Sequence, residues 1–431
     1  METGSLALEE LHGAFMPLGR CERLEGAEVL ALARARIHLA GVEAVLAGLQ
    51  LADHRSPRSA AGSAACLLAM EQLLRTKGET IVHAYIALII AMLFALTPAW
   101  AQSEVFKVGP IAAARGEARS GLLEIPVGVD AATQVPITII HGAKPGPVLA
   151  LVAGTHGYEY SPVLALNRIK PKIDPKKLKG TVILVHVANL PSFLKRTIYY
   201  NPWDWKNLNR VYPGKADGTS TERIAYAITK EVIERSDYLI DLHCGDGNEA
   251  LLPYAYWMTL DDEKLNEQAK QLVLAFGLST IVIDKERPRD PKASAYTSNT
   301  AMTRNKPAIT IESGQLGSMS EEWIAPIESG VMNVLRHLKM MEGRATYVAQ
   351  PRWIDQNEVL RSPATGVLWP KGKLGKTVKK GELLAVVNDF FGKPLAEVRA
   401  PFDGVLLYIL GTPPINADEP VAFVGQVREG A

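Results

Sequence analysis

The feature that most constrains the fold of this chain is the alternation of short apolar runs with longer amphipathic runs between Pro136 and Met341. The apolar runs hold little besides Val, Ile, Leu and Ala, which is typical of strands covered on both faces of a parallel sheet. Strands are expected at Ile137 to Ile140, Val148 to Ala153, Val182 to Val187, Tyr238 to Leu242, Thr280 to Ile283 and Ala308 to Ile311. Helices are expected at Tyr160 to Ile169, Glu222 to Arg235, Glu263 to Phe276, Ala295 to Arg304 and Glu321 to Met341. This order predicts an α/β fold with a mixed, mostly parallel sheet flanked by helices.

The length of the chain, 431 residues, exceeds what one ordinary hydrophobic core organises, so we expect more than one part. Residues 102–345 hold the strand and helix alternation and are assigned to the α/β domain. After Met341 the helical pattern stops, and short runs rich in Val, Gly and Pro follow. Residues 346–431 are therefore predicted to form a small C-terminal all-β domain.

The N-terminal hundred residues carry a different signal. Arg75 and Lys77 precede an apolar stretch at 81–96, and Ala99-Trp100-Ala101 follows it, which is the pattern of a signal peptide. We expect residues 70–101 to be that signal peptide and the mature protein to be periplasmic or secreted, with no stable membrane partner after cleavage. The alternative is a membrane anchor retained through 81–96. Residues 1–69 are interpreted as a mis-called or disordered extension upstream of a start at Met70.

Two short segments place metal-ligand chemistry at the ends of predicted strands. His156 and Glu159 follow the run that ends at Ala153, and their spacing lets both side chains converge where the turn becomes a helix. His243 closes a second apolar run. Two imidazoles and one carboxylate are the ligand set of a catalytic zinc site, which keeps one position open for water. The sequence therefore predicts a metal-dependent hydrolase, with Asp241 orienting His243 from behind.

Further polar residues supply the groups that hydrolysis needs. Arg210 suits bidentate binding of a carboxylate, and Asn209 can donate beside it. Arg196 is a cation that would stabilise the oxyanion of a tetrahedral intermediate if it lies near the metal. Glu312 ends a predicted strand and is expected to act as the general base, because three ligands are already assigned.

Four motifs in this order, G-x-H-G-x-E at 154–159, N-L-N-R at 207–210, D-L-H at 241–243 and I-E-S-G at 311–314, resemble the succinylglutamate desuccinylase/aspartoacylase family. That family is related to the zinc carboxypeptidases and cleaves the amide bond of N-acyl amino acids. The resemblance implies a zinc-carboxypeptidase-like sheet and one Zn²⁺ per chain, bound by His156, Glu159 and His243. It also implies Glu312 as general base and proton shuttle, Arg196 polarising the scissile carbonyl, and Asn209 with Arg210 binding the substrate carboxylate.

The chain departs from the family pattern at several points. Asn207 stands where the named members carry Asp, so we expect a different charge near the substrate carboxylate. Cys244 follows a metal ligand but has no identifiable base partner, and we interpret it as a small buried residue. The named members are cytosolic, so the export signal points to another substrate. Lys393 lies near the modified lysine of a carrier-like domain, but Gly392 and Pro394 do not match its usual flanks. The β domain is expected instead to cap the cleft or to form an oligomer contact.

The net charge of the chain and its remaining candidate residues indicate which partners and functions to expect. The formal net charge of +1 gives no electrostatic footprint for nucleic acid, so we expect a small acylated amino acid as substrate and possible homo-oligomers. His186 is interpreted as packed, and the segment at 284–290 as a solvated loop or an edge of the site that reads substrate charge. Aromatic candidates for the pocket are Trp203, Trp205 and Tyr296. The rival functions are an exported zinc carboxypeptidase, an esterase with the same site, and a binding protein without turnover.

Overall fold

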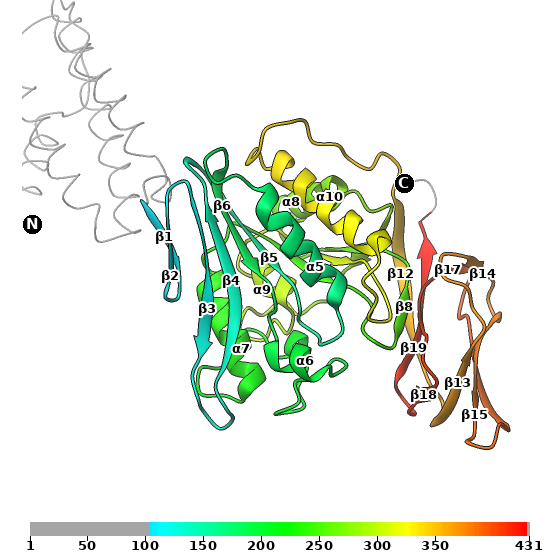
Figure 1. Ribbon diagram of the computed structural model, residues 1–431. Coiled ribbons are helices and arrows are strands. Elements are labelled where there is room, and N and C mark those ends of the chain that lie inside the picture. Colours follow the sequence, from blue (N-terminus) through cyan, green and yellow to red (C-terminus); the bar gives the residue numbers. More distant parts are fainter. Residues whose placement is uncertain (1–103, 429–431) are drawn as a thin grey trace, which may run out of the picture. The chain divides into compact units, whose positions relative to one another are not determined.

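A computed structural model describes residues 104–428, so the predicted signal peptide and the segment before it lie outside the described residues. The described part of the chain starts with two antiparallel strand pairs, enters the alternating α/β region and ends in short strands (Figure 1). The first half contains β1 (Val105–Val108), β2 (Ile111–Ala114), β3 (Glu117–Ile125), β4 (Thr133–His141), β5 (Lys144–Val152), α5 (Tyr160–Ile169), η2 (Lys170–Lys172), β6 (Lys179–Val185), α6 (Leu190–Lys195), η3 (Leu208–Arg210), α7 (Ser220–Ile228), η4 (Thr229–Ile233) and β7 (Tyr238–His243).

The second half returns to the sheet and then leaves the helical region. It contains β8 (Glu249–Leu251), β9 (Tyr254–Met258), α8 (Glu263–Phe276), β10 (Thr280–Asp284), α9 (Thr297–Met302), β11 (Ala308–Glu312), α10 (Glu321–His337), β12 (Arg352–Arg361), β13 (Gly366–Pro370), β14 (Thr377–Val378), β15 (Leu383–Asn388), β16 (Pro394–Arg399), β17 (Gly404–Leu410), β18 (Pro414–Ile415) and β19 (Pro420–Val427).

The main sheet is mixed, as predicted. Its central strands β6, β5, β7 and β11 are neighbours and run parallel, β9 joins β11 in the antiparallel direction, and β10 and β12 continue in parallel. Strand β12 then pairs antiparallel with β19. Because β12 contributes to both parts, one hydrogen-bonded sheet extends from the α/β region into the C-terminal strands.

Helices cover both faces of this sheet (Figure 1). In β5, Leu149 and Leu151 pack into the core that α5 and α10 share, whereas Ala150 and Val152 pack into the core beneath α7. Since successive side chains of a strand point to opposite faces, a strand buried on both sides must be apolar throughout. That requirement explains why the central strands were readable from the sequence.

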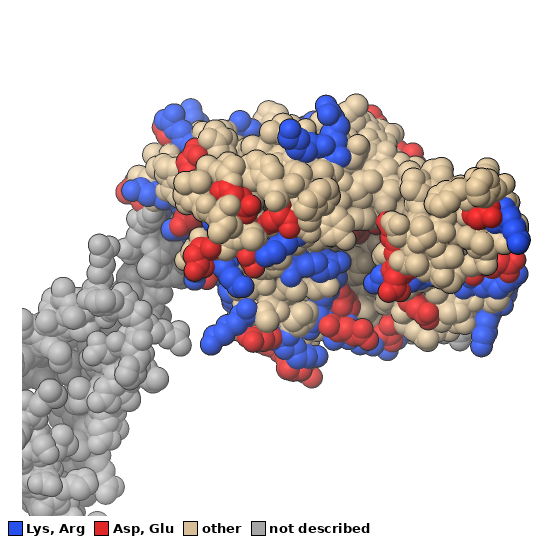
Figure 2. Space-filling view, turned by 90° about the horizontal axis from the view of Figure 1, so that it is seen from below, with Lys and Arg blue, Asp and Glu red and all other residues tan. Residues whose placement is uncertain are grey.

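The C-terminal strands build their own small core. Strands β16, β15, β13 and β18 form a separate antiparallel sheet that packs on β17 and β19 around residues such as Leu384, Leu406 and Val424. No helix within residues 104–428 is both long enough and apolar enough to cross a membrane. On the face shown in Figure 2, basic and acidic side chains are interspersed rather than gathered into a patch of one sign.

Candidate active site

The predicted metal ligands meet at the carboxyl ends of β5 and β7. Strand β5 ends at Val152, and Gly154 then turns the chain with a φ of +68°, a conformation that costs a glycine little. His156 lies in this turn, and Glu159 is the residue from which α5 begins. His243 is the last residue of β7. The three side chains therefore come from two neighbouring strand ends, as the sequence predicted.

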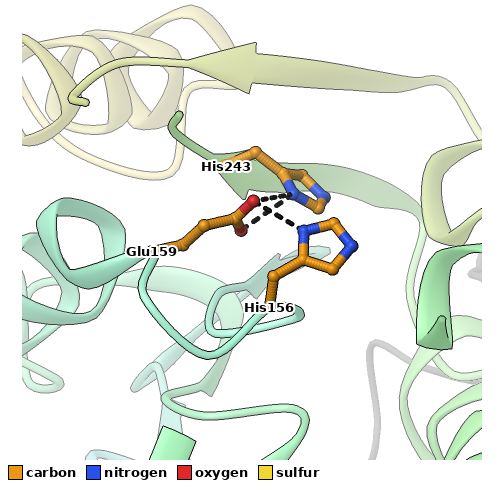
Figure 3. A group of neighbouring side chains, drawn as sticks. All are labelled: His156, Glu159 and His243. Atoms are coloured by element: carbon orange, nitrogen blue, oxygen red, sulfur yellow. Dashed lines mark hydrogen bonds and ion pairs between the residues drawn. The ribbon is translucent and has the colours of Figure 1, made fainter. Parts of the chain in front are cut away.

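The triad has the geometry of a metal site. One ligand atom of each residue lies within 4.8 Å of the other two, and all three residues are buried. The Nδ1 atoms of His156 and His243 both face the Glu159 carboxylate, at 2.6 and 3.0 Å (Figure 3). Both oxygens of the buried Glu159 carboxylate face imidazole nitrogens, since Oε1 lies beside His156 and Oε2 beside His243. A buried carboxylate between two imidazole Nδ1 atoms fits a divalent cation, and the His/Glu/His donor set fits zinc.

A second layer of polar groups fixes the orientation of both imidazoles. Nε2 of His243 lies 3.1 Å from Oδ1 of Asp241, which is fully buried. Nε2 of His156 lies 3.1 Å from Oδ1 of Asn207. An acceptor behind Nε2 leaves Nδ1 free to bind a metal. Asn207 therefore contacts His156 and also lines the cavity, and its effect on the charge beside a substrate carboxylate stays a prediction.

The charges of the triad support one another in the metal-free protein. Burial alone would raise the pKa of Glu159, but the two histidines hold the pKa of that carboxyl well below its usual range. Burial would lower the pKa of His243, yet Asp241 and Glu159 outweigh it and raise the pKa well above the ordinary value. The raised pKa of each histidine and the lowered pKa of Glu159 have the same cause, which is the attraction between the imidazoles and the carboxylates.

Glu312 ends β11 beside the triad, in register with His243 of β7. Its carboxylate makes no hydrogen bond or ion pair to another residue of 104–428. The Glu312 side chain lines a cavity that the three residues of the triad also line. Burial raises the pKa of Glu312, and the charges of Glu159 and Glu249 add to the rise, while His243 opposes it. A desolvated carboxyl group of this kind suits proton transfer near neutral pH.

Asn209 and Arg210 reach the cavity from η3. Oδ1 of Asn209 accepts hydrogen bonds from the backbone N–H and the hydroxyl of Thr297, at 2.9 and 3.1 Å, and this directs its Nδ2 toward His243. The Arg210 guanidinium stacks over the ring of Tyr296 at 4.8 Å from the centroid. Tyr296 lines the cavity, as the sequence analysis suggested for its aromatic candidates, and its ring holds the Arg210 cation in place.

The charged run at 284–290 contributes a second guanidinium. Arg287 lies 3.7 Å from the centroid of the same Tyr296 ring and is paired with Asp284. Arg287 lines the cavity, so the reading of this segment as an edge of the site agrees with the structure better than the reading as a solvated loop. Two cations gathered on one aromatic ring form a wall suited to an anionic group of the substrate.

Tyr199, Asp246 and Glu249 are functional candidates that the sequence did not reveal. Asp246 accepts a hydrogen bond from the backbone N–H of Tyr199 at 2.8 Å, and Oε1 of Glu249 accepts one from the Tyr199 hydroxyl at 2.6 Å. Tyr199 has a φ of +61°, an uncommon conformation that these two acids hold in place. Burial raises the pKa of Asp246 to about 6 and that of Glu249 to about 7. A signal was present, since both acids lie within six residues after His243.

The C-terminal strands close one side of the cavity. The cavity has a volume of about 360 Å³, which suits a small molecule. Strand β8 pairs with β17, and β17 brings Tyr408 to the lining. The remaining lining residues from this part of the chain are Val359, Arg361, Pro420 and Phe423. The prediction of a β cap over the cleft therefore agrees with the structure.

Arg196 is not brought to the triad. It is exposed at the end of α6, with a φ of +54°, and lines a separate hollow with Tyr160, Phe193 and Met319. The segment that follows is held by Asp246, so Tyr199 enters the cavity and Arg196 faces outward. The arrangement therefore gives no support to the expected contact between Arg196 and a reacting carbonyl.

Other sequence candidates have structural roles. Cys244 is buried, and burial raises the pKa of its thiol well above the usual value, which opposes a nucleophilic role. His186 pairs with the hydroxyl of Thr138 at 2.8 Å, as expected of a packed histidine. Trp203 and Trp205 are exposed and do not line the cavity. Lys393 lies exposed between β15 and β16.

Comparisons with known proteins agree with the geometry. The model of the succinylglutamate desuccinylase/aspartoacylase catalytic domain matches residues 145–338. An N-alpha-acetyl-L-2,4-diaminobutyric acid deacetylase from Halomonas elongata is 30% identical over 321 residues, which cover 72% of this chain and 92% of the relative.

Two solved structures have a similar fold. The product-bound ectoine utilization protein from Ruegeria pomeroyi is 26% identical, with a TM-score of 0.66, over 75% of this chain and 99% of that one. A succinylglutamate desuccinylase from Silicibacter sp. TM1040 is 24% identical, with a TM-score of 0.66, over 75% of this chain and all of that one. The second likeness concerns the fold alone.

Proposed function

The chain belongs to the succinylglutamate desuccinylase/aspartoacylase family, and from that membership and the site geometry we propose that it is a zinc-dependent deacylase of N-acyl amino acids. The observation that carries the proposal is the buried His156, Glu159 and His243 triad with the unpaired carboxylate of Glu312 beside it in one cavity. The deacetylase from Halomonas elongata acts, by its name, on an N-acetyl amino acid. We carry over only the bond type, an amide between an acyl group and an amino acid.

In this proposal His156, Glu159 and His243 hold the metal through the two Nδ1 atoms and the carboxylate. A bound zinc ion supplies Lewis acidity, which lowers the pKa of water and polarises a carbonyl. Glu312 takes the proton of the attacking water and delivers it to the departing nitrogen, so that its carboxyl group acts first as base and then as acid. Its raised pKa suits this exchange, because a stronger base accepts the proton more readily.

Asn209 and Arg210 position the substrate. The Arg210 guanidinium is held over Tyr296 and donates to the backbone oxygen of Asn209 at 2.7 Å, which leaves further N–H groups for a carboxylate. The Asn209 amide is fixed by Thr297 and donates beside it. A substrate carboxylate held there places the neighbouring amide bond next to the triad.

The test combines metal analysis with a substrate panel on one purified sample. We expect about one zinc per chain, loss of hydrolysis in chelator, and recovery when zinc is restored. The panel holds N-acyl amino acids, the corresponding esters and dipeptides, which separates a deacylase from an esterase and a carboxypeptidase. Full hydrolysis in chelator, or metal with no hydrolysis of any panel member, would contradict the proposal.

A matched pair of variants separates the metal site from general damage. His243→Gln removes a ligand and is expected to lose both metal and activity. His186→Gln changes a half-buried histidine that pairs with Thr138 away from the triad, and it is expected to keep both. Equal metal content in the two variants would rule out His243 as a ligand.

We also propose that the protein is exported, on the pattern of residues 70–101 alone. N-terminal sequencing of protein recovered from the periplasm or medium of a bacterial host is expected to begin at Gln102. Recovery in the membrane fraction with the stretch at 81–96 intact would favour the anchor instead.

A further inference from the structure

Glu249 is a carboxylate in the catalytic cavity with no cation beside it. It lines the same cavity as the triad and forms no ion pair with a described residue. Both of its hydrogen-bond partners among the described residues are donors, the Tyr199 hydroxyl at 2.6 Å on Oε1 and the backbone N–H of Asp246 at 3.0 Å on Oε2. A carboxylate accepts about four hydrogen bonds, so acceptor capacity remains on the side of the cavity.

Glu249 has acceptor capacity left for a ligand, whereas the neighbouring acids Glu159 and Asp246 are engaged with other groups. Glu159 belongs to the triad, and Asp246 accepts from two backbone N–H groups, those of Tyr199 and Gly247. Burial raises the pKa of Glu249 to about 7, and the charges of Asp246 and Glu159 add to the rise. An acid in such surroundings gains stability from a cation that enters the cavity with the substrate.

Aromatic side chains surround the same carboxylate. Tyr199, Tyr254 and Tyr408 all line the cavity, and the charge of Glu249 adds to the rise in pKa that burial imposes on each of them. They keep their protons at any ordinary pH, so each presents a ring and a neutral hydroxyl oxygen. A carboxylate among aromatic rings is the surrounding that binds an alkylammonium group, through charge-assisted hydrogen bonds and cation–π contacts.

Strand pairing and hydrogen bonds hold Glu249 in place, which favours selection of a substrate by its charge. Glu249 begins β8, which pairs with β17 so that Glu249 is in register with Leu410 and Leu251 with Tyr408. Two donors fix the carboxylate, and Asn248 also lies 3.0 Å from the Tyr199 hydroxyl. An ammonium group therefore finds its acceptors already placed, and little ordering is needed on binding.

We propose that Glu249, with Tyr199, Tyr254 and Tyr408, forms a subsite for an ammonium group of the substrate. The inference rests on the proposed deacylase function and deepens it, because it assigns a charge class to the substrate. The ammonium group lies either on the amino acid side chain or on the acyl group. The guanidinium of Arg210 takes the carboxylate of the same molecule.

Isosteric ligand pairs distinguish the two sources. Nα-acetyl-L-ornithine is compared with Nα-acetyl-L-norleucine, and glycyl-L-norleucine with propionyl-L-norleucine, so that within each pair an ammonium replaces a methyl group. Binding is measured calorimetrically on the full chain in chelator, where no turnover occurs, and kcat/KM is then measured with zinc. At least one ammonium ligand is expected to bind about tenfold or more tightly than its neutral partner. Equal binding within both pairs would overturn the assignment.

Variants connect the preference to Glu249. Glu249→Gln is expected to abolish the preference while the neutral ligands change less than about threefold. Glu358→Gln removes an exposed carboxylate of β12 that does not line the cavity, and it is expected to leave the preference intact. A preference that survives in Glu249→Gln would refute the subsite.

Glu249→Asp keeps the charge, and therefore covers the case in which the glutamine variant does not fold. Its carboxylate is withdrawn by one methylene, so the preferred ammonium ligand is expected to lengthen by one methylene, from ornithine to lysine or from glycyl to β-alanyl. An unchanged preference would count against the subsite. Hydrolysis of the neutral substrates reports the deacylase function separately, so failure of that function is distinguishable from failure of the ammonium subsite.

Discussion

The substitution Glu312→Gln tests the proposed chemistry most directly, because it removes one charge and almost no volume. Glu312 lies at the end of β11 in register with His243, and no described residue is hydrogen-bonded to its carboxylate. Glutamine occupies the same space but accepts no proton. The triad keeps all its atoms, so metal binding is expected to persist.

The two expected effects of this substitution have opposite signs. Loss of general acid–base catalysis lowers kcat by about 10²- to 10⁴-fold. The metal-free protein, by contrast, becomes more stable, because burial raises the pKa of Glu312 and an ionised, unpaired carboxylate disfavours the folded state. Relief of that desolvation contributes on the order of 1–3 kcal/mol.

The stabilisation depends on pH in a defined direction. Below the ordinary glutamate pKa of about 4.3, Glu312 is protonated in both the folded and the unfolded chain, so wild type and variant differ little. As the pH rises through that value, the unfolded chain ionises while the folded state resists, and the wild type loses stability that the variant retains. The gap in the free energy of unfolding therefore widens from acid toward neutral pH.

The assay is denaturant unfolding in chelator at several pH values, together with steady-state kinetics and zinc content at neutral pH. Glu358→Gln serves as the control, because its carboxylate is exposed. Turnover at the wild-type rate with metal bound would remove Glu312 from the mechanism. A stability gap that is constant across pH would refute the electrostatic reasoning even if activity fell.

Three further predictions concern the structures that support the site. Asp241→Asn replaces the carboxylate behind His243 by an amide, and zinc affinity measured against a competing chelator is expected to fall about 10- to 100-fold; unchanged affinity would contradict the orienting role. The pKa of Glu222 is lowered to about 2, chiefly by the backbone N–H of Thr219, so Glu222 stabilises the fold above pH ~4.5 by up to about 3 kcal/mol and this stability is lost as the pH falls toward 2. Glu222→Gln should therefore flatten the acid side of the curve of Tm against pH, and an unaltered curve would show that the cap contributes nothing. At Gly157 an added Cβ would lie 2.4 and 2.5 Å from two backbone oxygens, so Gly157→Ala is expected to cost about 1–3 kcal/mol in denaturant unfolding and to weaken zinc binding; wild-type values for both would show that the turn has room.

The sequence predicted those elements whose signals are local. Helices α5 and α8 begin and end at the predicted residues, and α8 starts at the Asp262 side-chain cap and ends before Gly277 in the left-handed conformation. Helix α9 spans only Thr297–Met302, and the helix expected from Glu222 to Arg235 is α7 continued by a π-helical turn. Strands β8 and β9 were missed, because Pro253 interrupts their apolar run and their partners β17 and β11 are distant in sequence.

The same distinction applies to the site. His156, Glu159 and His243 were predictable because each stands at the end of an apolar strand, and parallel strands bring their carboxyl ends to one edge. Tyr199 and Arg287 lie in irregular segments whose direction depends on tertiary contacts. Arg196 shows the converse, since its chemistry was suitable but a left-handed residue at the end of α6 turns it outward. The types of the residues predicted the chemistry of the site. Which residues of a loop reach the cavity depends on tertiary packing, which the sequence pattern does not reveal.

The continuity of the main sheet gives the C-terminal strands a defined role. Strand β12 pairs with β10 of the α/β region and with β19 of the C-terminal strands, and β8 pairs with β17. These ladders connect the two parts by backbone hydrogen bonds, so Tyr408 is held at the cavity by the same sheet that positions the triad. The proposed metal ligands and the proposed base come from the α/β region, whereas one side of the cavity comes from β12, β17 and β19. Substitutions in that wall should therefore alter which substrate binds while the groups that cleave the bond stay in place.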